Sequence, residues 1–178
     1  HELLRRERPD LTLLVYDAAR PIAVQRIMWS LVRGTPNTYY VASPARGGLH
    51  NFGLAVDLTL CDTLGYALPM GTPFDHFGPT ANIDREPSLV RTGRITQQEL
   101  QNRLLLRRVM RAAGFTTVTS EWWHFNSGPA ARARALGEAE HGADRTIGLP
   151  AVSASAVRLA EPRASEVFLL SLLHSRVG

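Results

Sequence analysis

Lysine is absent from this sequence of 178 residues, and cysteine occurs only once. All 20 basic side chains are arginines, scattered without interleaved aromatic residues, so the sequence predicts no nucleic-acid-binding surface. The single cysteine, Cys61, cannot form an internal disulfide, which excludes a disulfide-stapled scaffold but leaves the compartment open. No apolar run approaches the roughly 20 residues of a membrane-spanning helix, so no integral membrane segment is expected.

What remains is an ordinary globular composition. Hydrophobic residues make up 44% of the chain and charged residues 20%, and the length allows one domain with a hydrophobic core. The sequence begins at His1 rather than at Met, so an N-terminal signal could have been removed or left out. Nothing in the composition predicts an oligomeric state.

The hydrophobic pattern predicts a mixture of strands and helices. Strands are expected over 11–16, 54–60 and 115–126, with a turn into a further antiparallel strand over 61–68. Long ordered loops are expected over 34–53 and 69–95, and such loops often carry function.

Two helices have clear end signals. Pro21 opens a helix that runs to Arg33. Thr96 and Glu99 form a capping box for a helix over 96–113, whose buried face is expected to begin with Leu100, Leu104 and Leu105.

The composition changes after Asn126. Residues 127–178 hold eleven alanines and one aromatic residue, Phe168, which predicts little packing capacity. We therefore expect a folded domain over 1–128 and an Ala-rich extension over 129–178, loosely packed or partly helical. Within the extension, 166–177 could form a short amphipathic helix.

Polar residues gather at the ends of three apolar segments, "YDAARP" (16–21), "HNFGLAVD" (50–57) and "EWWH" (121–124). The anomaly among them is Asp57, because an ionised carboxylate in a buried strand is costly unless something pairs with it. His50 and His124 would add two imidazoles to this carboxylate. Three such ligands with one open position are typical of a catalytic zinc site.

Strand geometry sets a condition on this hypothesis. His50 and Asp57 differ by an odd number, so they would face opposite ways in one regular strand. The chain must therefore turn near Gly53, which permits such a turn. Glu121 and His124 pose the same problem, so their strand must bulge or end there.

Each residue also has an ordinary explanation when it is taken alone. A lone histidine on an apolar face is usually a hydrogen-bonded core residue, and Asp57 could pair with an arginine. Arg20 could simply pair with Asp17 at a helix start, and Trp122 and Trp123 are typical of core packing. The occurrence of all three clusters in one small domain favours a functional site.

The motifs "HNFGLAVDLTL" and "EWWHFN" resemble those of the zinc D-alanyl-D-alanine dipeptidases of the VanX type, in the M15 family of peptidases. The family pattern is Ser-x-His-x-x-Gly-x-Ala-x-Asp, followed by Glu-x-Trp-His. "VYDAARP" resembles the Arg-bearing segment of the family and "LPMGTPFD" its mid-chain loop, so the resemblance covers about residues 10–126. Gly48 departs from the pattern, because the motif has Ser there.

The resemblance implies an α+β fold, with a small antiparallel sheet flanked by helices and the zinc site on the sheet. It implies zinc-dependent hydrolysis of D-alanyl-D-alanine in cell-wall precursor metabolism, with one Zn²⁺ per chain and a small dipeptide as partner. The source would be bacterial, with the compartment open between cytoplasm and periplasm.

By the same resemblance, His50, Asp57 and His124 bind the zinc ion, and Glu121 is the general base that moves a proton from water to the leaving amine. Three further residues would contact the substrate. They are Arg20, which steadies the developing oxyanion, Asp75, which receives the ammonium group, and Trp123.

Two other functions stay open. One is a related M15 D,D-carboxypeptidase or peptidoglycan endopeptidase, which needs an open groove rather than a closed pocket. The other is an inactive cell-wall-binding or metal-binding module, against which the presence of Glu121 argues, because binding alone needs no base.

Overall fold

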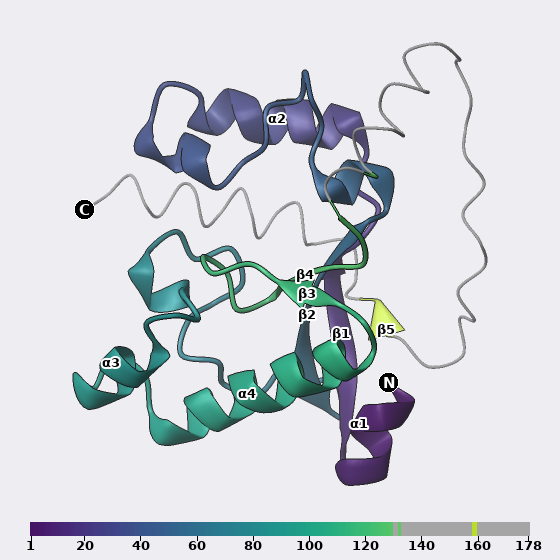
Figure 1. Cartoon of the computed structure of the whole chain (residues 1–178), viewed down its shortest axis with the longest axis vertical. Helices are drawn as coiled ribbons and strands as arrows, with labels where there is room; N and C mark the ends of the chain where they lie inside the picture. The colour runs from purple at the N-terminus through teal and green to yellow at the C-terminus, as the bar shows by residue number, and fades with distance from the viewer. Residues whose placement is uncertain (130–131, 133–157, 160–178) are drawn as a thin grey trace.

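The computed structural model describes residues 1–129, 132 and 158–159 (Figure 1). The α-helices are α1 (Glu2–Glu7), α2 (Ile22–Val32), α3 (Glu86–Arg91) and α4 (Gln97–Ala112). The strands are β1 (Leu11–Asp17), β2 (Ala55–Asp62), β3 (Thr116–Thr117), β4 (His124–Asn126) and β5 (Arg158–Leu159). Short 3-10 helices are η1 (Pro36–Tyr39), η2 (Leu49–Phe52) and η3 (Pro79–Ala81).

The strands form one sheet in the order β3-β4-β2-β1-β5. The first three pairings are antiparallel, and β5 adds a short parallel pairing at the β1 edge. The central strand, β2, is buried along nearly its whole length, and its buried side chains include the polar Asp57 and Thr59. The predicted α+β fold with a small antiparallel sheet is confirmed.

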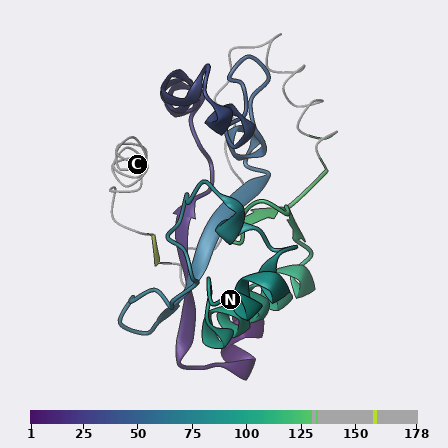
Figure 2. The same cartoon turned by 90° about the vertical axis from the view of Figure 1, so that its left-hand side faces the viewer.

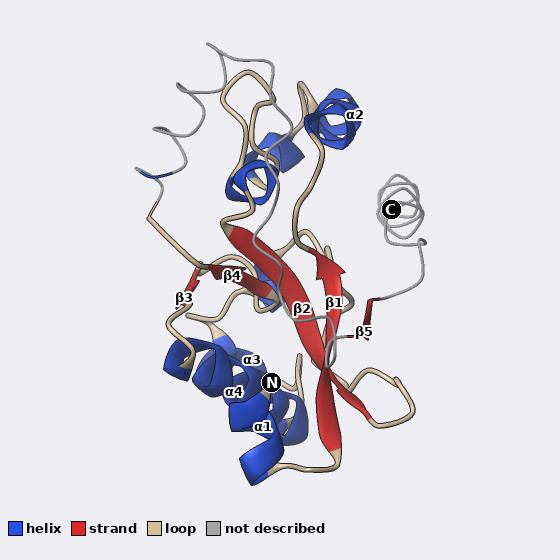
Figure 3. Cartoon of the chain, turned by 90° about the vertical axis from the view of Figure 1, so that its right-hand side faces the viewer, coloured by secondary structure: helices blue, strands red, loops and turns tan. Residues whose placement is uncertain are grey.

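Figures 2 and 3 show α1, α3 and α4 gathered beside the sheet and α2 at the far end of the molecule. The main core lies between the sheet and α4, where Leu60, Leu106 and Phe125 have no exposed surface. A smaller apolar cluster of Met28, Val32 and Val41 lies under α2. The polar cluster of His50, Asp57 and His124 lies between these two packed regions.

The predicted helices and their capping box are confirmed, with ends one residue inside the expected bounds. The predicted buried face of α4 is wrong at Leu104, which is 39% exposed, whereas Leu105 is partly buried against the core. The buried stripe instead follows Asn102 and Arg103 through Leu106 to Val109 and Met110, at helical spacing.

The strand predicted over 115–126 is in fact a hairpin. Only β3 and β4 pair, and residues 118–123 form the connection between them. The β-rich composition of this connection has a different cause, since Trp122 and Trp123 are buried in the core rather than paired in the sheet. The loop predicted over 69–95 likewise contains η3 and α3.

The predicted helix over 166–177 lies outside the described residues, and so does the predicted extension over 129–178 except at positions 129, 132 and 158–159. Among the helices that the structure does describe, none has the length and apolar character to cross a membrane.

Candidate metal centre

Sheet pairing brings Asp57 and His124 together across 67 residues of sequence. The two residues stand directly opposite each other on β2 and β4, and opposed residues of an antiparallel pair have neighbouring side chains. On the other side of β2, the register with β1 shifts between Val15 and Asp17, so that Asp17 also stands opposite Asp57. Asp57 is therefore the point at which three strands meet.

A tight turn brings in His50. This residue lies in η2, outside the strand, and Gly53 ends η2 with a left-handed φ of 64°. Glu121 lies in the connection before β4, so it does not share a strand with His124. The predicted reversal near Gly53 and the predicted strand end before His124 are both confirmed.

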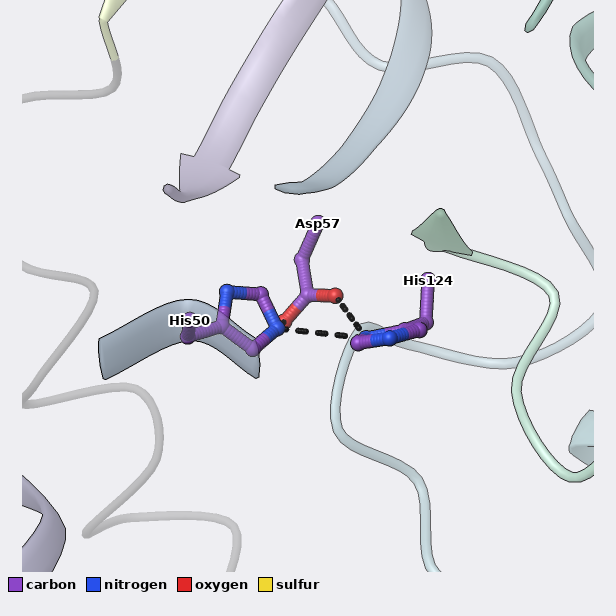
Figure 4. A group of neighbouring side chains, drawn as sticks. All are labelled: His50, Asp57 and His124. Atoms are coloured by element: carbon purple, nitrogen blue, oxygen red, sulfur yellow. Dashed lines mark hydrogen bonds and ion pairs between the residues drawn. The ribbon is translucent and has the colours of Figure 1, made fainter. Parts of the chain in front are cut away.

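The three candidate ligands converge on one point (Figure 4). His50 Nε2 lies 3.1 Å from His124 Nδ1 and 3.3 Å from an Asp57 carboxylate oxygen. The other Asp57 oxygen lies 2.9 Å from His124 Nδ1. All three side chains are largely buried, with exposed fractions of 8%, 3% and 12% for His50, Asp57 and His124.

The remaining ring nitrogens fix which atoms face the centre. His50 Nδ1 lies 3.2 Å from the Ala18 carbonyl, and His124 Nε2 lies 2.7 Å from Asn126 Oδ1. If these outer nitrogens donate to their oxygen partners, His50 Nε2 and His124 Nδ1 are left as lone-pair donors. Such outer hydrogen bonds are how proteins orient histidine ligands.

These distances fit a metal ion. Two atoms bound about 2.0–2.1 Å from a tetrahedral zinc stand about 3.3 Å apart, close to the observed nitrogen–nitrogen and nitrogen–oxygen separations. Two imidazole nitrogens with no proton between them would otherwise repel at 3.1 Å. Among the described residues, His50, Asp57 and His124 are the group whose donor atoms could hold a metal ion.

The charges of the site are strongly coupled. Burial alone would raise the pKa of the Asp57 carboxyl, but His50 and His124 outweigh it and hold that pKa well below its usual range. Burial alone would lower the pKa of His124, but its hydrogen bond to Asp57 and the charges of Asp57 and Glu121 raise it. Without a metal, His124 therefore takes up a proton more readily than a free imidazole does.

We expect that proton to compete with metal binding. A metal ligand must be neutral imidazole, so the apparent affinity for zinc should fall as the pH drops through the raised pKa of His124. The expected slope is about tenfold per pH unit for one displaced proton. Competition with a coloured chelator at pH 8, 7 and 6 measures it, and an affinity independent of pH would contradict this account of the His124–Asp57 pair.

Glu121 lies just outside the cluster. One of its carboxylate oxygens is 3.8 Å from His124 Nδ1, and burial raises the pKa of Glu121 to about 7. A carboxyl with such a pKa exchanges protons readily near neutral pH. Its position suits a group that acts beside a metal rather than one that binds it.

Arg20 is held at the rim of the cluster by two partners. Its Nε and Nη2 bond to Asp17 at 2.6 and 2.5 Å, and Nη1 donates to Gln25 Oε1 at 2.9 Å. The same guanidinium lies 3.9 Å from Asp57. Because a guanidinium has five N–H donors, one hydrogen on each terminal nitrogen is left for a bound molecule.

A pocket of about 180 Å³ opens onto these residues. Its lining includes the three candidate ligands with Arg20, Glu121 and Asp75, all predicted as site residues. Gly48, which stands where the motif has Ser, also lines it. Drug-sized ligands occupy about 300–1,000 Å³, so the pocket suits a smaller molecule.

Asp75 enters the pocket from a loop that is anchored on both sides. Phe74 stacks on Tyr16 with ring centres 4.5 Å apart, and Phe77 stacks on Tyr40 at 4.9 Å. Asp75 lies between these anchors with a φ of 58°, an uncommon conformation for a non-glycine residue and one often found at functional sites. Burial, Asp57 and Glu121 raise the pKa of Asp75 well above its usual value, against Arg20.

Trp123 differs from the other predicted site residues. Its side chain is 1% exposed, lies edge-on to Phe74 and Trp122, and is not part of the pocket lining. The structure places it in the core beneath the Asp75 loop, and this position does not support the prediction that it contacts the substrate.

Two supporting residues were not predicted from the sequence. Gln25 is 1% exposed and bridges Arg20 to the Ala42 carbonyl. Its signal was a polar residue on the same stripe of α2 as Met28 and Val32. Asn126 orients His124, and it lies two residues further along the same strand, on the same face.

Comparison with known proteins gives one family. The family model described as D-ala-D-ala dipeptidase, Peptidase_M15, matches residues 5–141. A D-alanyl-D-alanine dipeptidase of Escherichia coli (strain K12) is 37% identical over 121 residues, covering 68% of this chain and 58% of the relative. A D-alanyl-D-alanine dipeptidase of Synechocystis sp. is 32% identical over 150 residues, covering 67% of this chain and 61% of that relative.

A shorter match links the chain to a D-alanyl-D-alanine dipeptidase of Enterococcus faecium, with 40% identity over 88 residues, or 48% of this chain and 38% of the relative. The chain therefore spans about 60% or less of the length of these relatives.

Proposed function

The chain belongs to the Peptidase_M15 family of D-ala-D-ala dipeptidases, and from this membership we propose that it is a zinc-dependent dipeptidase that hydrolyses D-alanyl-D-alanine. The observation that carries the proposal is the convergence of His50, Asp57 and His124 within a small pocket that also holds Glu121. His and Asp ligands in this number suit zinc. When bound, the metal would polarise the scissile carbonyl and activate water.

The proton transfers fall to Glu121. Its carboxylate lies beside the ligand cluster without belonging to it. It accepts a proton from the attacking water and passes that proton to the leaving amine, which needs a group that titrates near neutral pH. Burial raises the pKa of Glu121 to about 7 in the metal-free protein, which supports this role.

Arg20 would stabilise the negative charge that develops on the oxygen of the scissile carbonyl. The salt bridge to Asp17 and the bond from Nη1 to Gln25 fix its plane before substrate arrives. A fixed cation with spare donors stabilises an oxyanion without reorganising at the moment of reaction.

Asp75 supplies the expected selectivity for a free amine. A dipeptide is a zwitterion, and its ammonium group would pair with the carboxylate of Asp75. Acetylating the amine removes that charge and leaves Asp75 unpaired in the pocket. We expect N-acetyl-D-alanyl-D-alanine to be cleaved about 100-fold more slowly than the free dipeptide, or slower still.

Asp75→Asn should reduce the difference in cleavage rate between the free and the N-acetylated dipeptide, chiefly because the free dipeptide binds more weakly. Values of kcat/KM for both substrates and both proteins measure it. Equal rates on the free and acetylated substrates would favour a carboxypeptidase with an open groove.

A panel of three substrates tests the proposal as a whole. The zinc-loaded protein should cut D-alanyl-D-alanine and leave both L-alanyl-L-alanine and a muramyl pentapeptide intact. Cleavage of the pentapeptide would favour the carboxypeptidase or endopeptidase function, and no cleavage of any of the three would favour an inactive binding module.

A further inference from the structure

A buried guanidinium underlies the loop that carries Asp75. The side chain of Arg103, on α4, has no exposed surface. Its paired carboxylate, on Glu86, stays 3.9 Å from Nη1, and within the described part of the chain that nitrogen has no hydrogen-bond partner. Burial lowers the pKa of Arg103, although Glu86 opposes the shift. Burying a cation costs free energy, and at 3.9 Å the Glu86 carboxylate is too far away to offset that cost fully.

What Arg103 does bond to is the two ends of one loop. Its Nε donates to the Met70 carbonyl at 2.6 Å, and its Nη2 donates to the Thr80 carbonyl at 3.1 Å. These carbonyls lie ten residues apart in the sequence. Asp75 lies midway between them, so one side chain closes the base of the loop that presents it.

Neighbouring bonds reinforce the same base. Asn102, also on α4, donates to the Pro69 carbonyl at 2.7 Å, and Trp122 donates to Thr72 Oγ1 at 2.7 Å. The backbone also approaches closely here, because a Cβ on Gly71 would lie 2.6 Å from Ile95 Cγ2 and 3.3 Å from an Arg103 nitrogen. The loop therefore rests directly on the guanidinium.

Core filling alone does not account for this arginine. Well-packed apolar residues often replace buried ionic groups with no loss of stability. Arg107, about one turn along α4, makes the close pair with Glu86, at 3.1 and 2.6 Å, so Glu86 does not depend on Arg103. The distinctive contribution of Arg103 is its simultaneous bond to both loop ends.

We propose that Arg103 is a positioning residue, which sets the place of Asp75 in the pocket and so the affinity and selectivity for a substrate with a free amine. The inference rests on the proposed function of Asp75. Arg103 touches no substrate and acts through the loop over 70–80. Small displacements of a binding group cost up to about 100-fold in rate.

The test compares Arg103→Met and Arg103→Lys with the control Arg107→Met. Arg107 lies on the same helix and loses a Glu86 pair when it is replaced, but makes no hydrogen bond to the loop. We expect Arg103→Met to raise KM for D-alanyl-D-alanine about tenfold with a smaller change in kcat. It should also reduce the preference for the free dipeptide over the N-acetylated dipeptide, while the zinc content stays at one per chain. Arg107→Met should keep both the KM and the preference.

Arg103→Lys keeps a cation and its stem but cannot bond both carbonyls at once. It should show an intermediate rise in KM, and it decides the matter if the Met variant does not fold. Folded Arg103 variants with wild-type KM and preference would overturn the inference while leaving the proposed function standing. Wild-type protein that cuts neither substrate would overturn the proposed function, and this inference with it.

Discussion

Replacing Glu121 with alanine is expected to slow the turnover of D-alanyl-D-alanine by about 100- to 10,000-fold, the range typical of a lost general base. The reason is its position, 3.8 Å from Nδ1 of His124, a proposed metal ligand, but outside the group of three converging donors. Initial rates measured with one zinc per chain give the size of the loss, and metal analysis of the same samples shows whether zinc is still bound.

Two further variants separate this role from packing. Glu121→Gln keeps the size of the side chain and removes the base, so it should be as inactive as Glu121→Ala. Glu2→Ala removes an exposed carboxylate on α1 and should change nothing. If zinc were lost together with activity in both Glu121 variants, Glu121 would be a metal ligand rather than a base.

Asp57→Ala is expected to have the second large effect, a loss of zinc binding and of activity together. Asp57 contacts both candidate histidine ligands, at 3.3 and 2.9 Å, and its charge favours a cation between them. Replacing a hydrogen-bond partner of a metal ligand typically costs 10–100-fold in metal affinity, so loss of a ligand itself should cost more than about 100-fold.

The measurement is zinc affinity by competition, together with the rise in melting temperature that zinc produces. A ligand that binds only the folded state raises its stability, so the wild type should gain a higher Tm with zinc and Asp57→Ala should not. Asp10→Ala, which removes a surface carboxylate paired with Arg8, is the control. Retained zinc affinity in Asp57→Ala would remove Asp57 from the metal site.

Much of the site could be predicted from the sequence because its residues violate local rules. Asp57 stands out as a charge in an apolar strand, and the spacing of His50 and Glu121 required breaks in regular structure, which occur at η2 and before β4. These local conflicts mark places where function overrides folding preference.

The supporting residues were harder to recognise because their contacts are tertiary. Gln25 and Arg103 each lie on an apolar helical stripe, yet only the fold shows that one holds Arg20 and the other the Asp75 loop. The same limit explains the error over 115–126. Tryptophan is common in strands, but here Trp122 and Trp123 are buried in a connection outside the sheet. The β-propensity of a residue does not show whether it is buried in the core or paired in a strand.

The most direct test of the central claim is a crystal structure of the zinc-loaded protein with diffraction recorded on either side of the zinc absorption edge. The account predicts one anomalous peak, about 2.0–2.2 Å from His50 Nε2, His124 Nδ1 and an Asp57 oxygen, with Glu121 beside it but not bound. A peak at other residues, or zinc held without Asp57, would contradict it.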